Sequence, residues 1–159
     1  MLDKSKIKEK LLNRELNKCG KAVIHISGNC MVPYIRDGDK VIIKRKKKYY
    51  LGDIVLVSSG EKLRAHRIVK KKEGMLITKG DLSFLHDKFY NSNIIGIIQK
   101  NLTLNKNFRK SRYKHLLRAL ISNMNGKLYR KYLFSRNKYI RFVLLKVHEK
   151  FTFILKIIV

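Results

Sequence analysis

The sequence predicts a mainly β fold that begins with a short helix and ends in a basic helical extension. Between residues 22 and 100, short β-prone runs alternate with Gly- and Asp-containing turns at regular spacing, which is typical of a compact antiparallel or coiled β structure. Apolar residues recur at helical spacing before this region and again after it. With 159 residues, 45% of them hydrophobic, the chain is long enough for one packed domain and an appendage.

We therefore expect three parts: an N-terminal helix in residues 1–20, a β core in residues 21–100 and an amphipathic helical extension in residues 101–159. The first helix should occupy residues 4–18, with Asp3 as its N-cap and Gly20 as its stop. Six strands are expected in the core, at residues 22–26, 40–44, 54–57, 63–70, 75–78 and 93–99.

The extension is strongly basic, since from Lys88 to the end the only acidic residue is Glu149. Residues 110–123 have a helical pattern, and residues 139–159 are apolar but interrupted by six charged side chains or histidines. These interruptions argue against a simple spanning helix. They fit equally a helix that lies on a membrane or a partner, and a helical subdomain with a solvated basic face.

The charge and the cysteine count limit the classes of function. The 38 Lys and Arg residues against 11 Asp and Glu residues give a formal charge of +27, which attracts nucleic acid, anionic membranes or acidic peptides. Two cysteines form no disulfide framework, and their spacing with the histidines matches no common zinc pattern, so we expect neither a metal site nor a cofactor. Without a secretory signal peptide, we expect a cytoplasmic location, peripheral at the cytoplasmic membrane if the extension binds it.

The residues that carry chemistry are a thiol, an imidazole and two carboxylates. Cys30 lies between Gly28 and the only proline, and a buried structural thiol is the simplest interpretation of it in isolation. His66 lies on an expected strand, and Asp81 and Asp87 follow in a later loop. Together these groups form the set that acyl transfer needs: a nucleophile, a general base and a carboxylate that orients the base. The nearby Arg64 and Arg67 would favour the thiolate.

Four ordered segments give the sequence a family resemblance. Residues 27–33 (Ser-Gly-Asn-Cys-Met-Val-Pro), followed by Asp37-Gly38-Asp39, resemble the nucleophile box of type I signal peptidases and their relatives in the S24/S26 family. Residues 51–57, 65–69 and 76–81 resemble the later boxes in the same order. The resemblance covers about residues 22–100 and implies a LexA/signal peptidase-like coiled β core.

The match is nearest to the Ser/His/Asp archaeal and endoplasmic-reticulum branch, because histidine stands at the base position. The resemblance implies Cys30 as the nucleophile in place of serine, His66 as the base, Asp87 as the better partner of His66, and Asp81 as support for the loop. It also implies that Ser27, Met31 and Pro33 shape the substrate site, with Ser27 as an optional oxyanion donor. Cysteine at the nucleophile position and the lack of an anchor before it depart from the family pattern.

The sequence thus favours an endopeptidase that cleaves a leader or secreted precursor peptide. The alternatives are a catalytically inactive peptide-binding module and a repressor-like nucleic-acid-binding protein. The expected partners are a precursor peptide and an anionic membrane surface that the extension would contact. Nucleic acid is less favoured as a partner, because no helix-turn-helix precedes the core.

Overall fold

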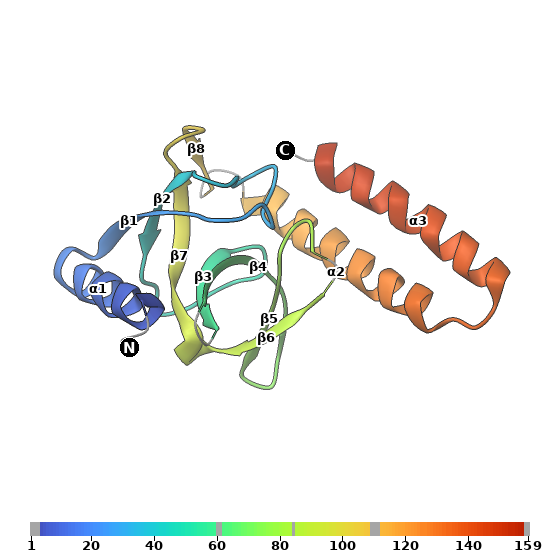
Figure 1. Cartoon of the computed structure of the whole chain (residues 1–159), viewed down its shortest axis with the longest axis horizontal. Helices are drawn as coiled ribbons and strands as arrows, with labels where there is room; N and C mark the ends of the chain where they lie inside the picture. Colours follow the sequence, from blue (N-terminus) through green and yellow to red (C-terminus); the bar gives the residue numbers. More distant parts are fainter. Residues whose placement is uncertain (1–3, 60–61, 84, 109–111, 158–159) are drawn as a thin grey trace.

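The computed structural model describes residues 4–59, 62–83, 85–108 and 112–157. A curled sheet forms the centre of the molecule, with one helix at the N-terminal side and a helical hairpin on the opposite side (Figure 1). The helices are α1 (Lys4–Cys19), α2 (Arg112–Phe134) and α3 (Lys138–Ile157), with a short 3-10 turn at Asn91–Asn93. The strands are β1 (Lys21–His25), β2 (Lys40–Lys44), β3 (Ile54–Ser59), β4 (Lys62–Lys72), β5 (Met75–Lys79), β6 (Asp87–Tyr90), β7 (Ile94–Asn101) and β8 (Lys106–Asn107).

The eight strands form one antiparallel sheet in the order β1-β2-β7-β3-β4-β5-β6, with β8 paired to β7. The fold prediction is confirmed: this is a coiled β core of the expected class, and all six predicted strands are present, with each end within two residues of its predicted position. The prediction missed β6 and β8. Both are short strands, and β6 begins at Asp87, one of the candidate site residues.

Two apolar clusters stabilise the sheet. The larger cluster packs α1 and β1 on β2, β3 and β7, and it also contains Met31 and Ile35 from the Cys30 loop. The smaller cluster joins β3, β4, β5 and β6 around Val55 and Phe89. Ala65 of β4 belongs to the larger cluster and Ile68 to the smaller one, so β4 is anchored on both sides of His66.

The N-terminal helix agrees with the predicted one. Of the apolar residues at helical spacing, Leu12 and Leu16 are buried against the sheet, whereas Ile7 and Leu11 are exposed. The helix ends at Cys19, and Gly20 follows with a φ of 67° while its N–H bonds the carbonyl of Leu16 at 3.0 Å. The N-cap predicted at Asp3 lies outside the described residues.

Helix α2 packs on the core with its polar face inward. His115, Arg118, Ser122 and Asn125 are buried, whereas the larger apolar side chains of Leu117, Leu120 and Met124 are exposed. The helix approaches the turn before β3 so closely that a Cβ on Gly52 would lie 2.7 Å from the backbone of His115. The predicted helix at residues 110–123 is therefore present but longer than predicted. Its polar face packs on the core, whereas an ordinary surface helix buries its apolar face. The first two residues of that prediction lie outside the described part.

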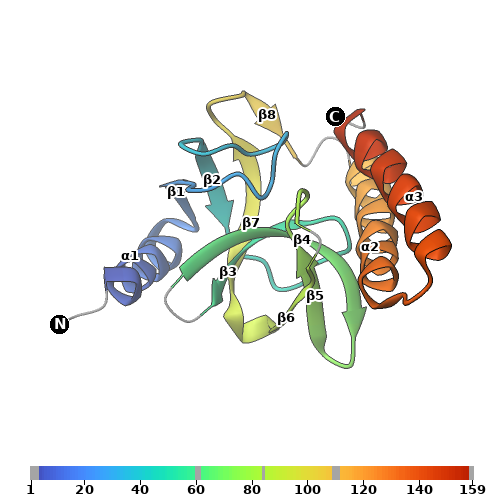
Figure 2. The same cartoon turned by 45° about the vertical axis from the view of Figure 1, so that its right-hand side comes forward.

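Helix α3 returns antiparallel along α2, and the two form a hairpin that projects from the core (Figure 2). Polar contacts join them: Nδ1 of His148 lies 2.5 Å from Oδ1 of Asn125, whose Nδ2 donates to Thr152 at 3.1 Å. Within the described residues, neither helix nor α1 has a stretch apolar enough to cross a membrane.

Candidate active site

The loop after β1 holds Cys30 against strand β4. Oδ1 of Asp37 accepts the Gly28 N–H at 2.7 Å, and Oδ1 of Asn29 accepts the Asp37 N–H at 3.1 Å. Asp39 ties the far end of the loop to β7, because its Oδ2 accepts a 2.6 Å bond from Asn101. The predicted turn residues thus act as the supports of the loop. The peptide bond between Val32 and Pro33 within the loop is cis.

Cys30 is half-buried and contacts two other elements. Its Sγ donates to the carbonyl of Ala65 on β4 at 3.5 Å, and its own carbonyl accepts the Leu82 N–H at 2.9 Å. A Cβ added to Gly80 would lie 2.9 Å from both Cβ and the carbonyl oxygen of Cys30. Only a glycine lets the β5–β6 loop approach the thiol-bearing residue this closely.

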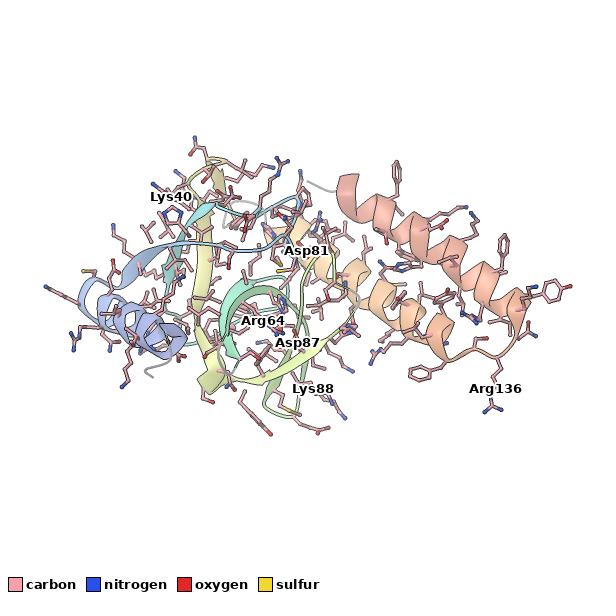
Figure 3. All side chains as sticks on the ribbon, viewed as in Figure 1. Lys40, Arg64, Asp81, Asp87, Lys88 and Arg136 are labelled. Carbon is pink, nitrogen blue, oxygen red and sulfur yellow. The ribbon has the colours of Figure 1, made fainter. Side chains whose placement is uncertain are left out.

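His66 is the residue after Ala65 and lies beside Asp87. Nδ1 of His66 is 3.0 Å from Oδ2 of Asp87, a close contact that is not an aligned hydrogen bond and becomes an ion pair only when the imidazole is protonated. Arg64 approaches the same carboxylate oxygen at 3.8 Å, and Figure 3 shows Arg64 and Asp87 next to each other at the centre of the molecule. Asp87 reaches this position because β6 pairs with β5 and begins opposite Thr78.

Burial keeps both the thiol and the imidazole in their neutral forms near neutral pH. Burial raises the pKa of Cys30 above its ordinary value of 9.0, and the backbone N–H and Arg64 only partly oppose this effect. Burial likewise lowers the pKa of His66 from 6.5, and Asp87 acts in the opposite direction. Arg67, which we expected to favour the thiolate, binds Asp81 instead. These pKa directions favour a neutral thiol beside a neutral imidazole and not a preformed thiolate–imidazolium pair.

Asp81 lies in a buried cluster with two arginines. Oδ1 and Oδ2 accept bonds from Nε and NH2 of Arg67 at 2.8 and 2.7 Å, and Nε of Arg118 on α2 lies 3.3 Å from Oδ2. These cations hold the pKa of Asp81 below its usual value although burial raises it. NH1 of Arg67 also bonds the Gly52 carbonyl at 2.9 Å and contacts Nδ1 of His115 at 2.7 Å. Asp81 is thus a structural anchor between β4, the β5–β6 loop and α2.

A second buried pair strengthens the same junction. Lys79, the last residue of β5, donates from Nζ to Oγ of Ser122 on α2 at 2.7 Å. Burial lowers the pKa of Lys79 to about 8, against the opposing effect of Asp81. Both side chains are almost inaccessible to solvent, so this serine–lysine pair cannot meet a substrate in this conformation.

The residues expected to shape the substrate site have different environments. Ser27 is exposed at the start of the loop, Pro33 is half-buried, and Met31 is buried in the apolar core beneath the loop. Their roles toward a substrate stay predictions. Sequence reasoning missed the support from α2, although one signal was present: the polar residues 115, 118, 122 and 125 are spaced three and four apart, as on one helix face.

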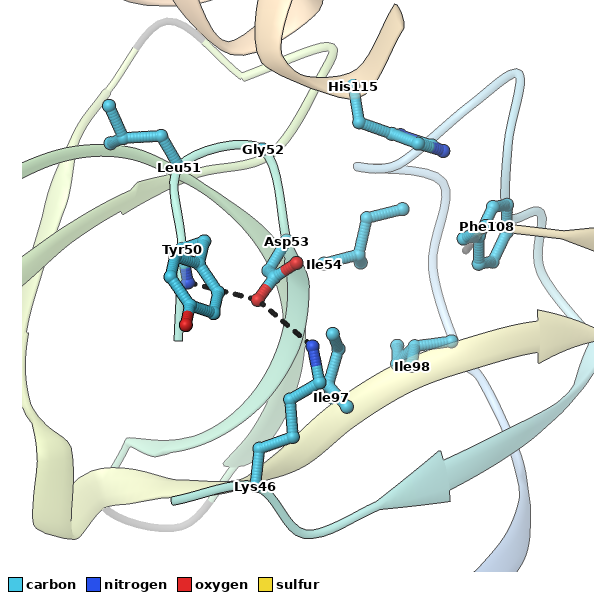
Figure 4. Close-up of a pocket in the computed structure, with 10 residues that line it drawn as sticks. All are labelled: Lys46, Tyr50, Leu51, Gly52, Asp53, Ile54, Ile97, Ile98, Phe108 and His115. Atoms are coloured by element: carbon cyan, nitrogen blue, oxygen red, sulfur yellow. Dashed lines mark hydrogen bonds and ion pairs between the residues drawn. The ribbon is translucent and has the colours of Figure 1, made fainter. Parts of the chain in front are cut away.

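A separate cavity of about 260 Å³ lies between the turn before β3 and the start of α2 (Figure 4). Ile54, Ile97 and Phe108 form part of its apolar wall, and Lys46 lies 3.7 Å from Asp53 within it. None of the candidate catalytic residues lines this cavity. Across the described ranges, His, Cys, Asp and Glu side chains form no group of three or more that could hold a metal ion.

Comparison with known proteins identifies the family. A search of curated proteins and a search of solved structures gave no match. The family model described as Peptidase S24-like matches residues 3–97, which include Cys30, His66, Asp81 and Asp87 but neither α2 nor α3. A match to this family model indicates a protein of the peptidase or LexA-like repressor type. Because the match covers more than half of the chain and agrees with the coiled β core, the chain belongs to the Peptidase S24-like family.

Proposed function

We propose that this protein is an endopeptidase of the signal peptidase type that cleaves a leader or secreted precursor peptide. Cys30 is the nucleophile, His66 the general base, and Asp87 the carboxylate that orients the imidazole. The observation that supports this proposal most is the 3.0 Å contact between His66 and Asp87, directly beside the Ala65 carbonyl that Sγ of Cys30 contacts. Asp81 supports the loop through its arginines and does not take part in the proton transfer.

The reaction follows from the protonation states. Asp87 holds Nδ1 of His66, which leaves Nε2 as the proton acceptor. Sγ turns from the Ala65 carbonyl to the imidazole, its proton moves to Nε2, and the sulfur attacks the scissile carbonyl. The tetrahedral intermediate collapses when the imidazolium gives that proton to the leaving amine, and a thioester remains on Cys30. Water, deprotonated by His66, then hydrolyses the thioester, which releases the acid product and regenerates the thiol.

The test is cleavage of a peptide library by the full chain, with new termini identified by mass spectrometry. We expect cleavage by the wild-type protein and by Cys19→Ala, which alters the exposed cysteine. Cys30→Ala and His66→Ala should each lose it, and Cys30→Ser should keep at most weak activity, because a hydroxyl is a far weaker acid than a thiol. A covalent adduct on Cys30 with the mass of an acyl fragment would support the thioester directly.

Two results would contradict the proposal. Cleavage that persists in Cys30→Ala would remove the thiol from the mechanism. Retention of peptides with unchanged mass by the wild-type protein, without cleavage of any of them, would instead favour the peptide-binding module, in which an extended peptide adds to the sheet.

A further inference from the structure

The α2–α3 hairpin presents apolar side chains to solvent on the side of α2 that faces away from the core. Tyr113, Leu117, Leu120 and Met124 repeat every three or four residues along α2, and each is exposed. The polar face of the same helix is buried against Asp81 and Lys79. The helix cannot turn over to bury its apolar face without breaking these buried bonds, so the apolar stripe is fixed outward.

The tip of the hairpin is still more exposed. Phe134 at the end of α2 and Tyr139 at the start of α3 are 84% and 85% accessible. Figure 1 shows this tip as the part of the hairpin farthest from the sheet, and Figure 3 shows Arg136 pointing outward from the turn between the helices. Aromatic rings beside basic side chains are the composition found at the interface between a membrane and water.

Charge decides what this surface fits. Residues 101–159 contain 15 Lys and Arg residues and a single acid, Glu149. A second copy would bring the same positive charge to the surface, and the core of a protein interface is depleted in lysine. Phosphates of nucleic acid would match the charge but would leave the aliphatic stripe without a partner. Anionic lipid matches both, because its headgroups attract the cations and its acyl boundary accepts apolar side chains.

We propose that the α2–α3 hairpin binds the surface of an anionic lipid bilayer, with Phe134 and Tyr139 entering the interfacial layer. The hairpin lies on the membrane and does not span it. Because α2 has 23 residues, it extends about 35 Å from its start to the tip. This proposal does not depend on whether Cys30 is a nucleophile.

The first experiment uses the absence of tryptophan from the chain. Phe134→Trp places a single fluorophore at the tip, and Tyr90→Trp places one at an exposed position of β6 as the matched control. Vesicles of phosphatidylcholine alone and vesicles with about one third phosphatidylglycerol are added to the full-length proteins. We expect a blue shift, and quenching by brominated acyl chains, only for Phe134→Trp and only with the anionic vesicles. No shift at the tip, or an equal shift at both positions, would overturn the proposal.

The second experiment separates the local surface from the overall charge. Arg136→Gln with Lys138→Gln removes two charges at the tip, and Lys47→Gln with Lys48→Gln removes two exposed charges on the core. The tip pair should weaken vesicle binding by about fivefold for each charge removed, and the core pair should weaken it much less. Equal losses of vesicle binding in the two pairs would show that the overall positive charge attracts the vesicles and that the tip is not a docking surface. A duplex DNA arm at the same ionic strengths completes the test: tighter binding to DNA than to vesicles, lost in the tip pair, would assign the surface to nucleic acid instead.

The two proposals fail separately. Cleavage of soluble peptides without vesicles should be unchanged in the tip variants, because these side chains do not contact the catalytic residues. Circular dichroism and thermal unfolding of each variant check that the exposed substitutions leave the fold intact.

Discussion

Nε of Arg118 lies 3.3 Å from Oδ2 of Asp81, which joins a helix beyond the residues matched by the family model to a carboxylate within them. Asp81 lies between Gly80, which closely approaches Cys30, and Leu82, whose N–H donates to the Cys30 carbonyl. The helical extension is therefore a structural part of the site. This relationship, and the neutral state of the Cys30 and His66 side chains, lead to five predictions.

Arg118→Met should destabilise the protein by about 3 kcal/mol. Removing one partner of a buried ion pair costs roughly 3–5 kcal/mol, and the two bonds from Arg67 to Asp81 soften the loss. Urea unfolding measures the change, with Lys127→Met on the exposed face of the same helix as the matched control. We also expect peptidase activity per folded molecule to fall, with partial rescue by Arg118→Lys. Unchanged stability would mean that α2 is only loosely attached.

Gly80→Ala should reduce kcat more than it reduces stability. The added methyl would meet Cβ and the carbonyl oxygen of Cys30 at 2.9 Å, so the loop must move away from the proposed nucleophile. Displacement of a reacting group by about 1 Å can cost about 100-fold in rate. Ser83→Ala, in the same loop, serves as the control because it leaves this contact unchanged. Equal activity of the two variants would show that the contact has no bearing on catalysis.

The acid limb of the pH–rate profile should have its midpoint below pH 6.5. The proposed mechanism needs neutral His66, and burial lowers the pKa of His66 from 6.5, so the proposed base stays neutral as the pH falls through 6.5. Measuring kcat/KM from about pH 4 to 9 checks this. Asp87→Asn removes the charge that favours the imidazolium, and the midpoint should shift further toward acid while kcat falls. A midpoint above 6.5 would contradict the assignment of His66 as the base.

In the free protein, a small alkylating reagent should modify Cys19 before Cys30. Cys19 is exposed, whereas Cys30 is half-buried and its pKa is raised, so little thiolate is present at pH 7. Peptide mapping after timed treatment with iodoacetamide gives the two rates. A peptide-derived electrophile should reverse the order, because binding would bring its reactive carbon to Sγ and His66. Preferential alkylation of Cys30 by the small reagent would indicate a preformed thiolate instead.

Stability should fall as the pH decreases from 6.5 to 4. Burial and the adjacent Arg67 lower the pKa of His115 to about 4 in the folded state, against 6.5 when unfolded, so the unfolded chain binds more protons in this window. His115 alone should remove about 2 to 3 kcal/mol from the unfolding free energy. This loss is absent above pH 6.5 and complete below pH 4. His115→Gln should flatten the dependence of the unfolding free energy on pH. The remaining slope comes from groups such as His148, whose pKa burial also lowers.

The local sequence determined most of the sheet and its supports. Alternating apolar runs, together with Gly and Asp turns, predicted six strands, because side-chain period and turn chemistry are properties of neighbouring residues. The ordered motifs indicated the candidate site residues, including Asp87, although they did not predict the strand that carries it. β6 itself escaped notice because four residues starting with Asp-Lys carry no clear alternation.

The tertiary structure alone decided which charged groups face each other. Asp81 and Asp87 are six residues apart in one loop region, yet one meets two arginines and the other meets His66, and that difference depends on strand pairing and on where α2 docks. The sequence indicated an amphipathic helix at α2 but not that its polar face is the buried one. Burial of a charged group is favourable only when a partner group is already in place, and Asp81 is a partner that folding brings from a distant part of the chain.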